Sequence, residues 1–328
     1  MYFDTGAFVL QQINTNVFKN PDALMKNYSG ITEFLKARII QRGGNPERET
    51  INLLAVSENN YLFRDDEGGC WRMYKYIDNV TAYDSAQKEG VLFEAARTFG
   101  EFQRSLADYP TQELYESIPD FHNTANRYKV FLRSVSDDLS GRADNVKDEI
   151  AILSSFSARA SIITDALKNG DIPTRVTHND TKLNNVLIDN ATGKGICVID
   201  LDTIMPGSLL YDFGDSVRFA ANTAAEDDPE LSHVSLDLGL FYEYTDGFLT
   251  GIENSITPRE KELLPISVFI LTYELALRFM SDYIDGDKYF GIKYPEHNLV
   301  RARNQIRLML DTDSKLGEMS KIVKELSK

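Results

Sequence analysis

The sequence predicts an α+β protein with two lobes, a small strand-rich lobe at residues 1–80 and a larger helical lobe at 81–328. Short apolar runs separated by turn residues dominate the first lobe, whereas helical periodicity dominates from about residue 81 to 168. Two short β-rich runs around an N-A-T-G-K-G turn then interrupt the helices at 175–203. Because ligands commonly bind in clefts between lobes, we expect this polar hairpin to belong to a functional site.

The first lobe is expected to contain a small sheet and one helix. FVLQQI at residues 8–13 and INLLAV at 51–56 predict strands. Residues 21–40 have apolar side chains at helical spacing, and Pro21 suits the first position of a helix. Residues 61–77 predict a hairpin that turns at D-D-E-G-G.

Helical periodicity organises the second lobe. The expected helices cover 89–109, 146–170, the stretch from 258 to about 280, and 297–327. Gly170 ends the second of them, and T-P-R-E at 257–260 is a capping box with proline at the first helical position. The most apolar stretch, 263–277, contains a proline and a glutamate and is too short to cross a bilayer, so a buried helix is expected.

Composition and charge restrict the partners. The chain has 328 residues, of which 42% are hydrophobic and 26% charged, and its formal net charge is -15. Because binding to nucleic acid requires a basic surface, we expect no nucleic-acid partner, although a metal ion can supply positive charge locally for a nucleotide. Cys70 and Cys197 lack metal-ligand spacing and are expected to be reduced and packed. The N-terminus has an acid at Asp4 and no basic region, so we expect no signal peptide. The reduced cysteines lead us to expect a cytoplasmic protein, and we further expect a monomer without a membrane partner.

The hairpin sequences T-H-N-D-T-K-L-N-N-V-L-I-D and V-I-D-L-D-T carry the strongest chemical signal. Phosphoryl transfer requires a base at the attacking hydroxyl, oxygen ligands for magnesium and a cation for the moving phosphate. Kinase catalytic loops supply these groups as an Asp, a Lys two residues later, an Asn five residues later and an Asp on the following strand. In this chain the offsets are met by Asp180, Lys182, Asn185 and Asp200, and His178 completes an H-x-D start.

On these residues the chain resembles the aminoglycoside phosphotransferase and choline kinase group, whose H-x-D-x-x-x-x-N and I-D-x-[DE] motifs form the active site of a protein-kinase-like fold. More narrowly, it is similar to N-acetylhexosamine 1-kinases in the segments at 8–25, 118–127, 178–189, 198–207, 211–218, 277–290 and 298–305. The resemblance implies a two-lobed kinase-like fold that uses ATP and Mg²⁺. It would transfer the γ-phosphoryl group to the anomeric hydroxyl of N-acetylglucosamine or N-acetylgalactosamine, giving the sugar 1-phosphate.

The resemblance also implies roles for the hairpin residues. Asp180 would be the catalytic base. Lys182 would neutralise charge on the γ-phosphate or, alternatively, would be a solvated loop cation. Asn185 and Asp200 would hold magnesium through oxygen atoms, with Asp202 as a candidate second metal contact.

Other residues are expected to support this loop or to bind the two substrates. His178 would brace the loop, and Asp212 would anchor it through its backbone. The resemblance points to Arg278 and Tyr289 for the sugar, since arginine can donate hydrogen bonds to vicinal hydroxyls and an aromatic ring can cover the apolar face of a pyranose. Further sugar-binding candidates are Phe219, Arg301 and Arg303, and the candidates for nucleotide contact are Tyr76 and Ile77.

Some of these features have structural alternatives. Arg278 lies in an apolar helix, where a buried ion pair with Glu274 or Asp282 would also explain it. The Phe-His pair at 121–122 is expected to pack the helical lobe. The acidic run at 226–230 is expected to be a solvated loop.

The N-terminus departs from the resemblance. A kinase of this type has a glycine-containing loop over the nucleotide phosphates, but only seven residues precede the expected strand at 8–13, and D-T-G within them suggests the turn of a shortened hairpin. That strand also contains no lysine. Because backbone donors to the phosphates would be missing, we expect this 328-residue chain to bind ATP weakly or to turn over slowly unless another segment substitutes, and a form extended upstream to be more active.

Two alternative functions stay open at this point. The same chemistry could serve another small hydroxyl compound, such as choline, homoserine or an aminoglycoside. Choline would call for an aromatic cage and an aminoglycoside for an acidic pocket. The short N-terminal lobe would also suit a pseudokinase or a binding module, although the intact Asp180, Asn185 and Asp200 argue against this.

Overall fold

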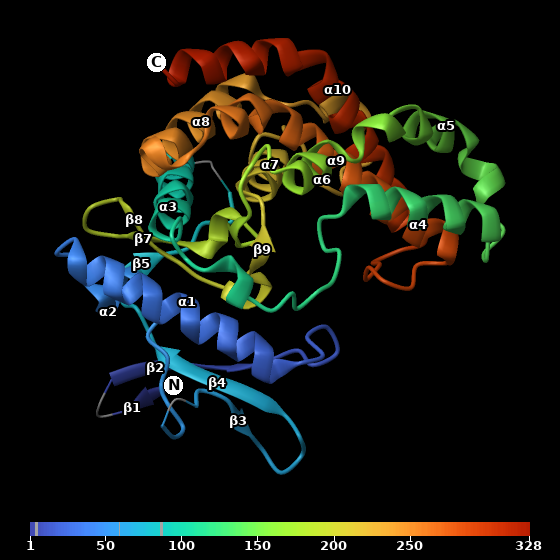
Figure 1. The fold of residues 1–328 in the computed structure, drawn as a ribbon. Helices are drawn as coiled ribbons and strands as arrows, with labels where there is room; N and C mark the ends of the chain where they lie inside the picture. The colour runs from blue at the N-terminus through green and yellow to red at the C-terminus, as the bar shows by residue number, and fades with distance from the viewer. Residues whose placement is uncertain (4–5, 59, 86–87) are drawn as a thin grey trace. The chain divides into compact units, whose positions relative to one another are not determined.

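The computed structural model describes residues 1–3, 6–58, 60–85 and 88–328 (Figure 1). The chain forms two compact units, each assembled from three separate segments. Unit 1 consists of Met1–Pro119, Thr174–Leu209 and Tyr244–Ile256. Unit 2 consists of Asp120–Pro173, Leu210–Glu243 and Thr257–Lys328. The polar hairpin at 175–203 therefore belongs to the same unit as the N-terminal residues.

A four-stranded antiparallel sheet begins unit 1. Its strands, in spatial order, are β1 (Tyr2–Phe3), β2 (Gly6–Gln12), β4 (Cys70–Lys75) and β3 (Phe63–Arg64). The expected strand at 8–13 and the hairpin at 61–77 are confirmed. The expected turn before β2 involves Asp4 and Thr5, which lie outside the described residues.

The register of β2 and β4 determines which side chains share a face. Gln11 pairs with Arg72 in the Cα register, and Leu10 pairs with Met73. Because successive side chains of a strand point to opposite faces, Gln11 and Arg72 share one face, and Leu10 and Met73 share the other. This alternation separates a polar pair from an apolar surface.

The predicted strand at 51–56 is wrong. Only Leu53 forms a bridge, to Tyr74 of β4, although Leu54 N–H also donates to the Met73 carbonyl at 2.8 Å. From Ala55 onward the side chains are exposed. The segment therefore follows the edge of β4 for a few residues and then leaves it, which an apolar run alone does not reveal.

Helix α1 (Pro21–Gln41) covers the polar face of this sheet (Figure 1). Asn20 caps it, with its side chain accepting from Ala23 N–H at 3.1 Å, and proline occupies its first turn as expected. Tyr28 of α1 lies against the Arg72 guanidinium of β4, with 4.3 Å between the arginine Cζ and the ring centroid. Helix α1 thus covers one face of the Arg72 guanidinium.

The rest of unit 1 surrounds one apolar core. The core joins α1, the sheet, α3 and the polar hairpin through buried residues that include Leu24, Ile31, Cys70, Phe99, Val186 and Val198. The remaining elements are α2 (Pro46–Glu49), α3 (Val91–Ser105), β5 (Val80–Thr81), β6 (Arg175–Thr177), β7 (Val186–Asp189), β8 (Gly195–Val198) and β9 (Met205–Gly207). Cys70 and Cys197 are free and buried, as expected.

Unit 2 is helical. Its elements include α4 (Thr124–Asp137), α5 (Lys147–Ser155), α6 (Ile162–Asn169), α7 (Leu209–Ala220), α8 (Leu238–Ile252), α9 (Pro258–Asp285) and α10 (His297–Leu326), of which α7 starts in unit 1 and α8 ends there. The expected last helix is confirmed as α10. The capping box is confirmed as well: Thr257 N–H donates to Glu260 Oε2 at 2.8 Å, and Glu260 N–H donates to Thr257 Oγ1 at 3.1 Å.

Helix α9 is longer than the apolar stretch that predicted it. With 28 residues it is long enough to cross a bilayer, so the expectation based on the shorter run is wrong on length. However, 83% of its most apolar window is buried inside the structure. The predicted buried helix is confirmed, and this degree of burial is ordinary for a core helix.

The single helix predicted at 146–170 is wrong, because the chain forms α5 and α6 with a bend of 44° between them. The break falls in the serine-containing sequence S-S-F-S-A-R-A-S. There Ser155 Oγ donates to the Ile152 carbonyl at 2.7 Å, a local bond of the kind that competes with continued helix. The predicted stop is confirmed, since Gly170 ends α6 with φ of 75°.

The acidic run at 226–230 is a loop, but the expectation that it is simply solvated is wrong. Glu226 pairs with Arg218, whose side chain is buried, at 3.0 Å. Asp227 pairs with the buried His297 at 3.2 Å. The loop is therefore held by ion pairs to α7 and α10.

Candidate active site

Two short antiparallel pairs position the polar hairpin in unit 1. β6 pairs with β9, and β7 pairs with β8, so the segment 178–185, from β6 to β7, and the segment 199–204, from β8 to β9, both run between the same two strand pairs. Thr203 Oγ1 donates to the His178 carbonyl at 2.6 Å and links the two segments directly. The residues predicted to carry the chemistry are thus brought together on one framework.

His178 is an internal brace of this framework. Its side chain is fully buried and contacts the edges of Phe99 and Phe102 of α3. Nδ1 accepts from Asp180 N–H at 3.2 Å, and Nε2 lies 2.9 Å from the Ile199 carbonyl, to which it donates. The imidazole therefore connects the first polar segment to the second.

Two residues of the hairpin have left-handed backbone conformations. Asn179 has φ of 65° and Asp200 has φ of 61°. Asparagine and aspartate tolerate this region better than other non-glycine residues. The Asn179 amide donates to the Thr177 carbonyl at 3.1 Å and to the Thr203 carbonyl at 2.8 Å, which stabilises the turn.

Asp180, Lys182 and Asn185 form a contiguous polar group. Lys182 Nζ pairs with Asp180 Oδ1 at 2.9 Å. Asn185 Nδ2 donates to the Asp180 carbonyl at 2.7 Å and lies 3.4 Å from Asp180 Oδ2. The lysine side chain is 51% exposed and that of Asp180 is 28% exposed, so both can reach a solvent-borne ligand.

Asp200 and Asp202 add negative charge beside this group. Partial desolvation, followed by the charges of Asp202 and Asp180, raises the pKa of Asp200. Within the described ranges, the Asp200 carboxylate has no hydrogen-bond or ion-pair partner. A carboxylate that has no such partner and lies next to two other carboxylates is suited to bind a cation.

These residues fit magnesium. They supply carboxylate and amide oxygens, which are the ligands that Mg²⁺ prefers. Among the described residues no three His, Cys, Asp or Glu side chains are already arranged to hold a metal ion. This agrees with the usual mode of Mg²⁺ binding, through one or two carboxylates together with substrate phosphates.

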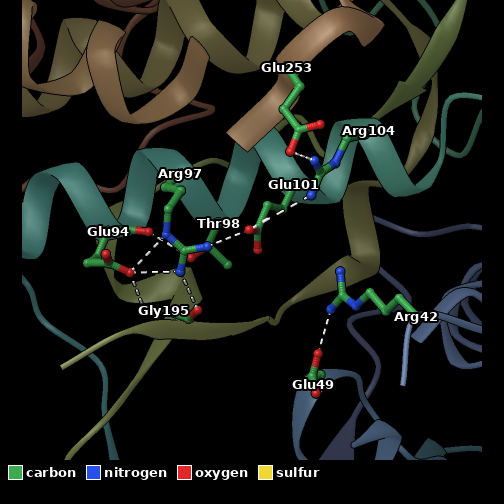
Figure 2. A network of polar contacts seen from close by, with 9 residues as sticks. All are labelled: Arg42, Glu49, Glu94, Arg97, Thr98, Glu101, Arg104, Gly195 and Glu253. Carbon is green, nitrogen blue, oxygen red and sulfur yellow. Dashed lines mark hydrogen bonds and ion pairs between the residues drawn. The ribbon is translucent and has the colours of Figure 1, made fainter. Parts of the chain in front are cut away.

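Polar contacts join helix α3 to β8 of the hairpin, as Figure 2 shows. Arg97 pairs with Glu94 at 2.7 Å and with Glu101 at 2.5 Å, and its Nη2 also donates to the Gly195 carbonyl of β8 at 3.0 Å. Gly195 N–H in turn donates to Glu94 Oε2 at 3.0 Å. The close approach requires a glycine at 195, since a Cβ there would lie 2.0 Å from Thr98 Oγ1.

One further ion pair extends this network away from the hairpin, and another lies apart from it. Arg104 of α3 pairs with Glu253 of the short helix Glu253–Ser255, and Arg42 pairs with Glu49 at 2.5 Å (Figure 2). These pairs are partly exposed, so each contributes little by itself. The Arg104–Glu253 pair links α3 to the segment that follows α8, whereas the Arg42–Glu49 pair joins the end of α1 to α2.

Arg72 is a residue of this site that the sequence interpretation missed. Its guanidinium is fully buried, and its Nη1 donates to Asp202 Oδ1. Asp202, expected as a candidate metal contact, therefore has a fixed cationic partner from β4. The available signal was an arginine between the apolar residues Trp71 and Met73 of a strand.

The sugar-binding candidate Arg278 lies in unit 2 on α9. Its guanidinium carbon is 5.3 to 5.8 Å from the ring centroids of Phe290, Tyr289 and Phe121. Among the described residues it forms no hydrogen bond and no ion pair.

The alternative of a buried ion pair is therefore wrong. Glu274 lies 2.9 Å from His122 and accepts from Thr124 Oγ1 at 2.6 Å. Asp282 accepts from three backbone N–H groups after α9 and from Asn298. Both acids are occupied by partners other than Arg278.

A pocket of about 170 Å³ contains this arginine, and it is lined by Arg127, Val130, Arg278, Ser281, Asp282, Asp285, Tyr289 and Phe290. Arg127 is a second residue that the sequence interpretation missed. Its Nε is buried without a hydrogen-bond partner, and burial together with the positive charge of Arg278 lowers the pKa of Arg127. Two arginines thus face one partly apolar pocket.

The other candidates occupy different surroundings. Arg303 pairs with Glu149 at 2.6 Å, and Arg301 donates to the Gly291 carbonyl and to Asn298 Oδ1, both at 3.2 Å. Phe219 is exposed at the end of α7. None of these three residues is among those that line the Arg278 pocket.

The remaining expected residues are placed as follows. Asp212 is buried in the first turn of α7 in unit 2. Tyr76 is half exposed and follows β4, with its N–H donating to the Ala7 carbonyl at 2.9 Å, and Ile77 is buried. Tyr76 is the more accessible of the two for a nucleotide.

A larger pocket, of about 480 Å³, lies on unit 1, and its lining includes Arg72 and Asp65 beside mostly apolar residues. Leu10, Phe63, Trp71 and Met73 line it, so it lies on the face of the sheet opposite the Arg72 guanidinium. Its carboxylate, Asp65, already accepts from Trp71 Nε1 at 2.7 Å. An apolar surface without converging free polar groups does not support catalysis.

Solved structures show the same fold. An aminoglycoside phosphotransferase from Alicyclobacillus acidocaldarius is 13% identical, with a TM-score of 0.63 over 97% of this chain and 87% of that one. A microcompartment-associated aminopropanol kinase is also 13% identical, with a TM-score of 0.60 over 97% and 88% of the two chains. A spectinomycin phosphotransferase is 12% identical, with a TM-score of 0.55 over 94% and 87%. The predicted kinase-like α+β fold is thereby confirmed.

The sequence also matches a model of the phosphotransferase enzyme family over residues 54–242, more than half of the chain. This range contains the hairpin residues Asp180, Asn185 and Asp200, together with the arginine that contacts Asp202. The chain therefore belongs to the phosphotransferase enzyme family.

Proposed function

We propose that this chain is an ATP- and Mg²⁺-dependent kinase that phosphorylates the anomeric hydroxyl of N-acetylglucosamine or N-acetylgalactosamine. Membership of the phosphotransferase enzyme family supports the reaction type. The observation that carries it is the pairing of Asp180 with Lys182 at 2.9 Å, on a loop that Asn185 holds at 2.7 Å. The resemblance to N-acetylhexosamine 1-kinases across seven segments supports the sugar.

In the proposed reaction Asp180 orients the C1 hydroxyl and accepts its proton. The O–H bond of the sugar breaks, a bond forms between O1 and the γ-phosphorus, and the bond from that phosphorus to the bridging oxygen breaks, leaving ADP with the electron pair. The long, half-exposed Lys182 side chain can exchange its contact with Asp180 for a γ-phosphate oxygen. This would free the carboxylate as charge develops on the phosphate.

Asn185 and Asp200 would hold the metal. Asn185 uses its Nδ2 on Asp180, so its Oδ1 is available as a ligand. Magnesium, when bound there, supplies positive charge that screens the phosphate oxygens. The chain's own contribution is to hold the oxygen donors and the base in fixed positions relative to each other.

The Arg278 pocket supports a neutral or anionic polar acceptor. A guanidinium without an ion-pair partner can donate hydrogen bonds to hydroxyls or to an acetamide carbonyl, and Tyr289, which is 71% exposed, offers a ring face. We assign this pocket to the sugar.

The same pocket disfavours cationic acceptors. Choline, aminopropanol and an aminoglycoside all carry positive charge, and Arg127 and Arg278 would repel it. Asp282 and Asp285 formally balance that charge, but Asp282 is already occupied by backbone N–H groups and Asp285 accepts from Ser134 at 2.9 Å, so neither is held ready for an ammonium group. A neutral acetamido sugar therefore fits better than these alternatives.

A coupled assay of ADP release across a panel of acceptors tests the proposal. The panel contains N-acetylglucosamine, N-acetylgalactosamine, choline, homoserine and an aminoglycoside, each with Mg·ATP. We expect turnover with the acetamido sugars and a fall in kcat of about 10² to 10⁴-fold in Asp180→Asn. Preferred turnover of choline or an aminoglycoside would contradict the sugar assignment. Absence of turnover with every acceptor would favour a pseudokinase or binding module.

A further inference from the structure

Arg72 is buried in unit 1 and has three defined contacts. Its Nη2 and Nε donate to Gln11 Oε1 at 2.7 and 3.2 Å, and its Nη1 donates to Asp202 Oδ1. The Tyr28 ring covers the guanidinium, 4.3 Å from its Cζ. A guanidinium clamped on two edges and one face has little freedom to change direction.

The contact with Gln11 bears on which strand supplies the positive charge of this sheet face. In protein kinases a lysine on a strand of the small lobe supplies positive charge next to the phosphates. Strand β2 contains no lysine, and its polar position is Gln11, which is the Cα partner of Arg72 in the neighbouring strand. The positive charge of this sheet face therefore comes from β4, and Gln11 orients it.

The contact with Asp202 directs that charge toward the metal-binding residues. Asp202 is two residues beyond Asp200 and is only 15% exposed. Arg72 occupies its Oδ1, and within the described part of the chain Oδ2 has no donor. A carboxylate held by one oxygen presents the other in a fixed direction.

We propose that Arg72 is a positioning residue that replaces the missing strand lysine by fixing Asp202, so that the free oxygen of Asp202 faces the metal and phosphate site. This inference rests on the proposed kinase function and identifies a residue on which metal binding depends. Arg72 is too deeply buried to contact a phosphate without rearrangement, so its effect passes through Asp202.

The test compares Arg72→Met with Arg64→Met in the full chain. Both variants remove an arginine from the same sheet, but Arg64 pairs on the surface with Asp22, with side chains 48% and 68% exposed. Affinity for ATP is measured by titration calorimetry with and without Mg²⁺, and folding by thermal denaturation. No sugar is present, so the result is independent of the acceptor.

We expect Arg72→Met to weaken binding of Mg·ATP about tenfold more than binding of ATP without Mg²⁺, and Arg64→Met to bind as wild type. Asp202→Asn should show the same Mg²⁺-specific loss. The double variant should be no weaker than either single variant, because both changes remove one interaction.

Three results would overturn the inference. The first is a folded Arg72→Met protein that binds Mg·ATP with wild-type affinity. The second is a double variant in which the losses of Mg·ATP affinity of the two single variants add fully. The third is a wild-type protein that binds ATP equally well with and without Mg²⁺. If Arg72→Met does not fold, Asp202→Asn and Arg72→Lys are tested in its place. The deciding quantity is again the loss of affinity for Mg·ATP relative to the loss of affinity for ATP without Mg²⁺. A wild-type protein that binds Mg·ATP but phosphorylates no acetamido sugar would contradict the proposed function, and the affinities of the variants would still decide the role of Arg72.

Discussion

Asn185 donates its side-chain amide to the backbone carbonyl of Asp180 at 2.7 Å, so the residue assigned to the metal also fixes the residue assigned as the base. The contact spans five residues of one loop and uses only the Nδ2 atom of Asn185. If Asn185 binds the metal as we propose, loop geometry and metal binding are coupled through a single side chain. Changes at Asn185 should affect both together.

Replacing Asn185 by aspartate should lower kcat by about 100-fold or more, because the donor to Asp180 is lost and a further negative charge is added. The matched control is Asn184→Asp, since the side chain of Asn184 donates to Asp84 on the surface, at 3.0 Å, and not to Asp180. Initial rates with saturating Mg·ATP measure the effect. Equal rates in the two variants would argue against the role given to Asn185.

Helix α8 should tolerate no side chain at Gly251. A Cβ at this position would lie 2.0 Å from the Arg97 carbonyl oxygen of α3. We expect Gly251→Ala to lower the free energy of unfolding by about 1 to 3 kcal/mol, since backbone must move to relieve the overlap.

Gly317→Ala provides the opposite case. Apart from the adjacent residues and the backbone of its own helix, no atom of the described residues lies within 4 Å of a Cβ at Gly317, which is exposed in α10. Alanine there should raise the free energy of unfolding by about 0.5 to 1 kcal/mol, because it restricts the unfolded chain. Chemical denaturation of both variants checks the pair, and a destabilised Gly317→Ala would contradict this explanation.

Glu274 should make the free energy of unfolding of unit 2 depend on pH in the acidic range. Burial by itself raises the pKa of Glu274, but His122 and Arg278 outweigh burial and hold the pKa below its ordinary value of 4.5. A carboxyl whose pKa is lowered by folding stabilises the protein fully above the unfolded pKa. That contribution is lost as pH falls below about 4.5 and through the folded pKa.

The variant Glu274→Gln should therefore be less stable than wild type at neutral pH, and the difference should shrink as pH falls below about 4.5. Denaturation curves at a series of pH values measure the difference. Glu262→Gln, on the exposed part of the same helix, controls for the loss of one carboxylate. A difference that stays constant down to pH 3 would be inconsistent with a lowered pKa.

Local signals in the sequence predicted much of the fold. Pro21, the Thr257–Glu260 capping box and Gly170 act through neighbouring backbone, and each begins or ends its helix as predicted. The offsets from His178 to Asp200 likewise predicted which polar residues the hairpin brings together. These features depend on short stretches of chain.

Contacts between distant segments could not be predicted in this way. Arg72 and Asp202 are 130 positions apart, and their pairing depends on the sheet register and on α1. The apolar run at 51–56 follows β4 at Leu53 and Leu54 and is exposed from Ala55, a difference that its composition does not encode. The lack of an ion pair at Arg278 depends on Glu274 and Asp282 having found partners elsewhere.

Removing Arg278 should separate sugar binding from phosphoryl chemistry. In Arg278→Met we expect the KM for the acetamido sugar to rise by about tenfold or more, while the affinity for Mg·ATP stays at the wild-type value, because hydrogen bonds from this guanidinium to the sugar are lost. Arg303→Met is the control, since Arg303 pairs with Glu149 instead of lining the pocket. Equal sugar KM values in the two variants would refute the pocket assignment.

The position of the transferred phosphate tests the central claim most directly. The chain is incubated with Mg·ATP and either N-acetylglucosamine or its methyl glycoside, in which O1 is blocked, and the products are examined by phosphorus and proton NMR. We predict a phosphate coupled to the anomeric proton of the free sugar and no product from the methyl glycoside. Phosphorylation of the methyl glycoside, or a phosphate on any other oxygen of the free sugar, would contradict the proposed reaction.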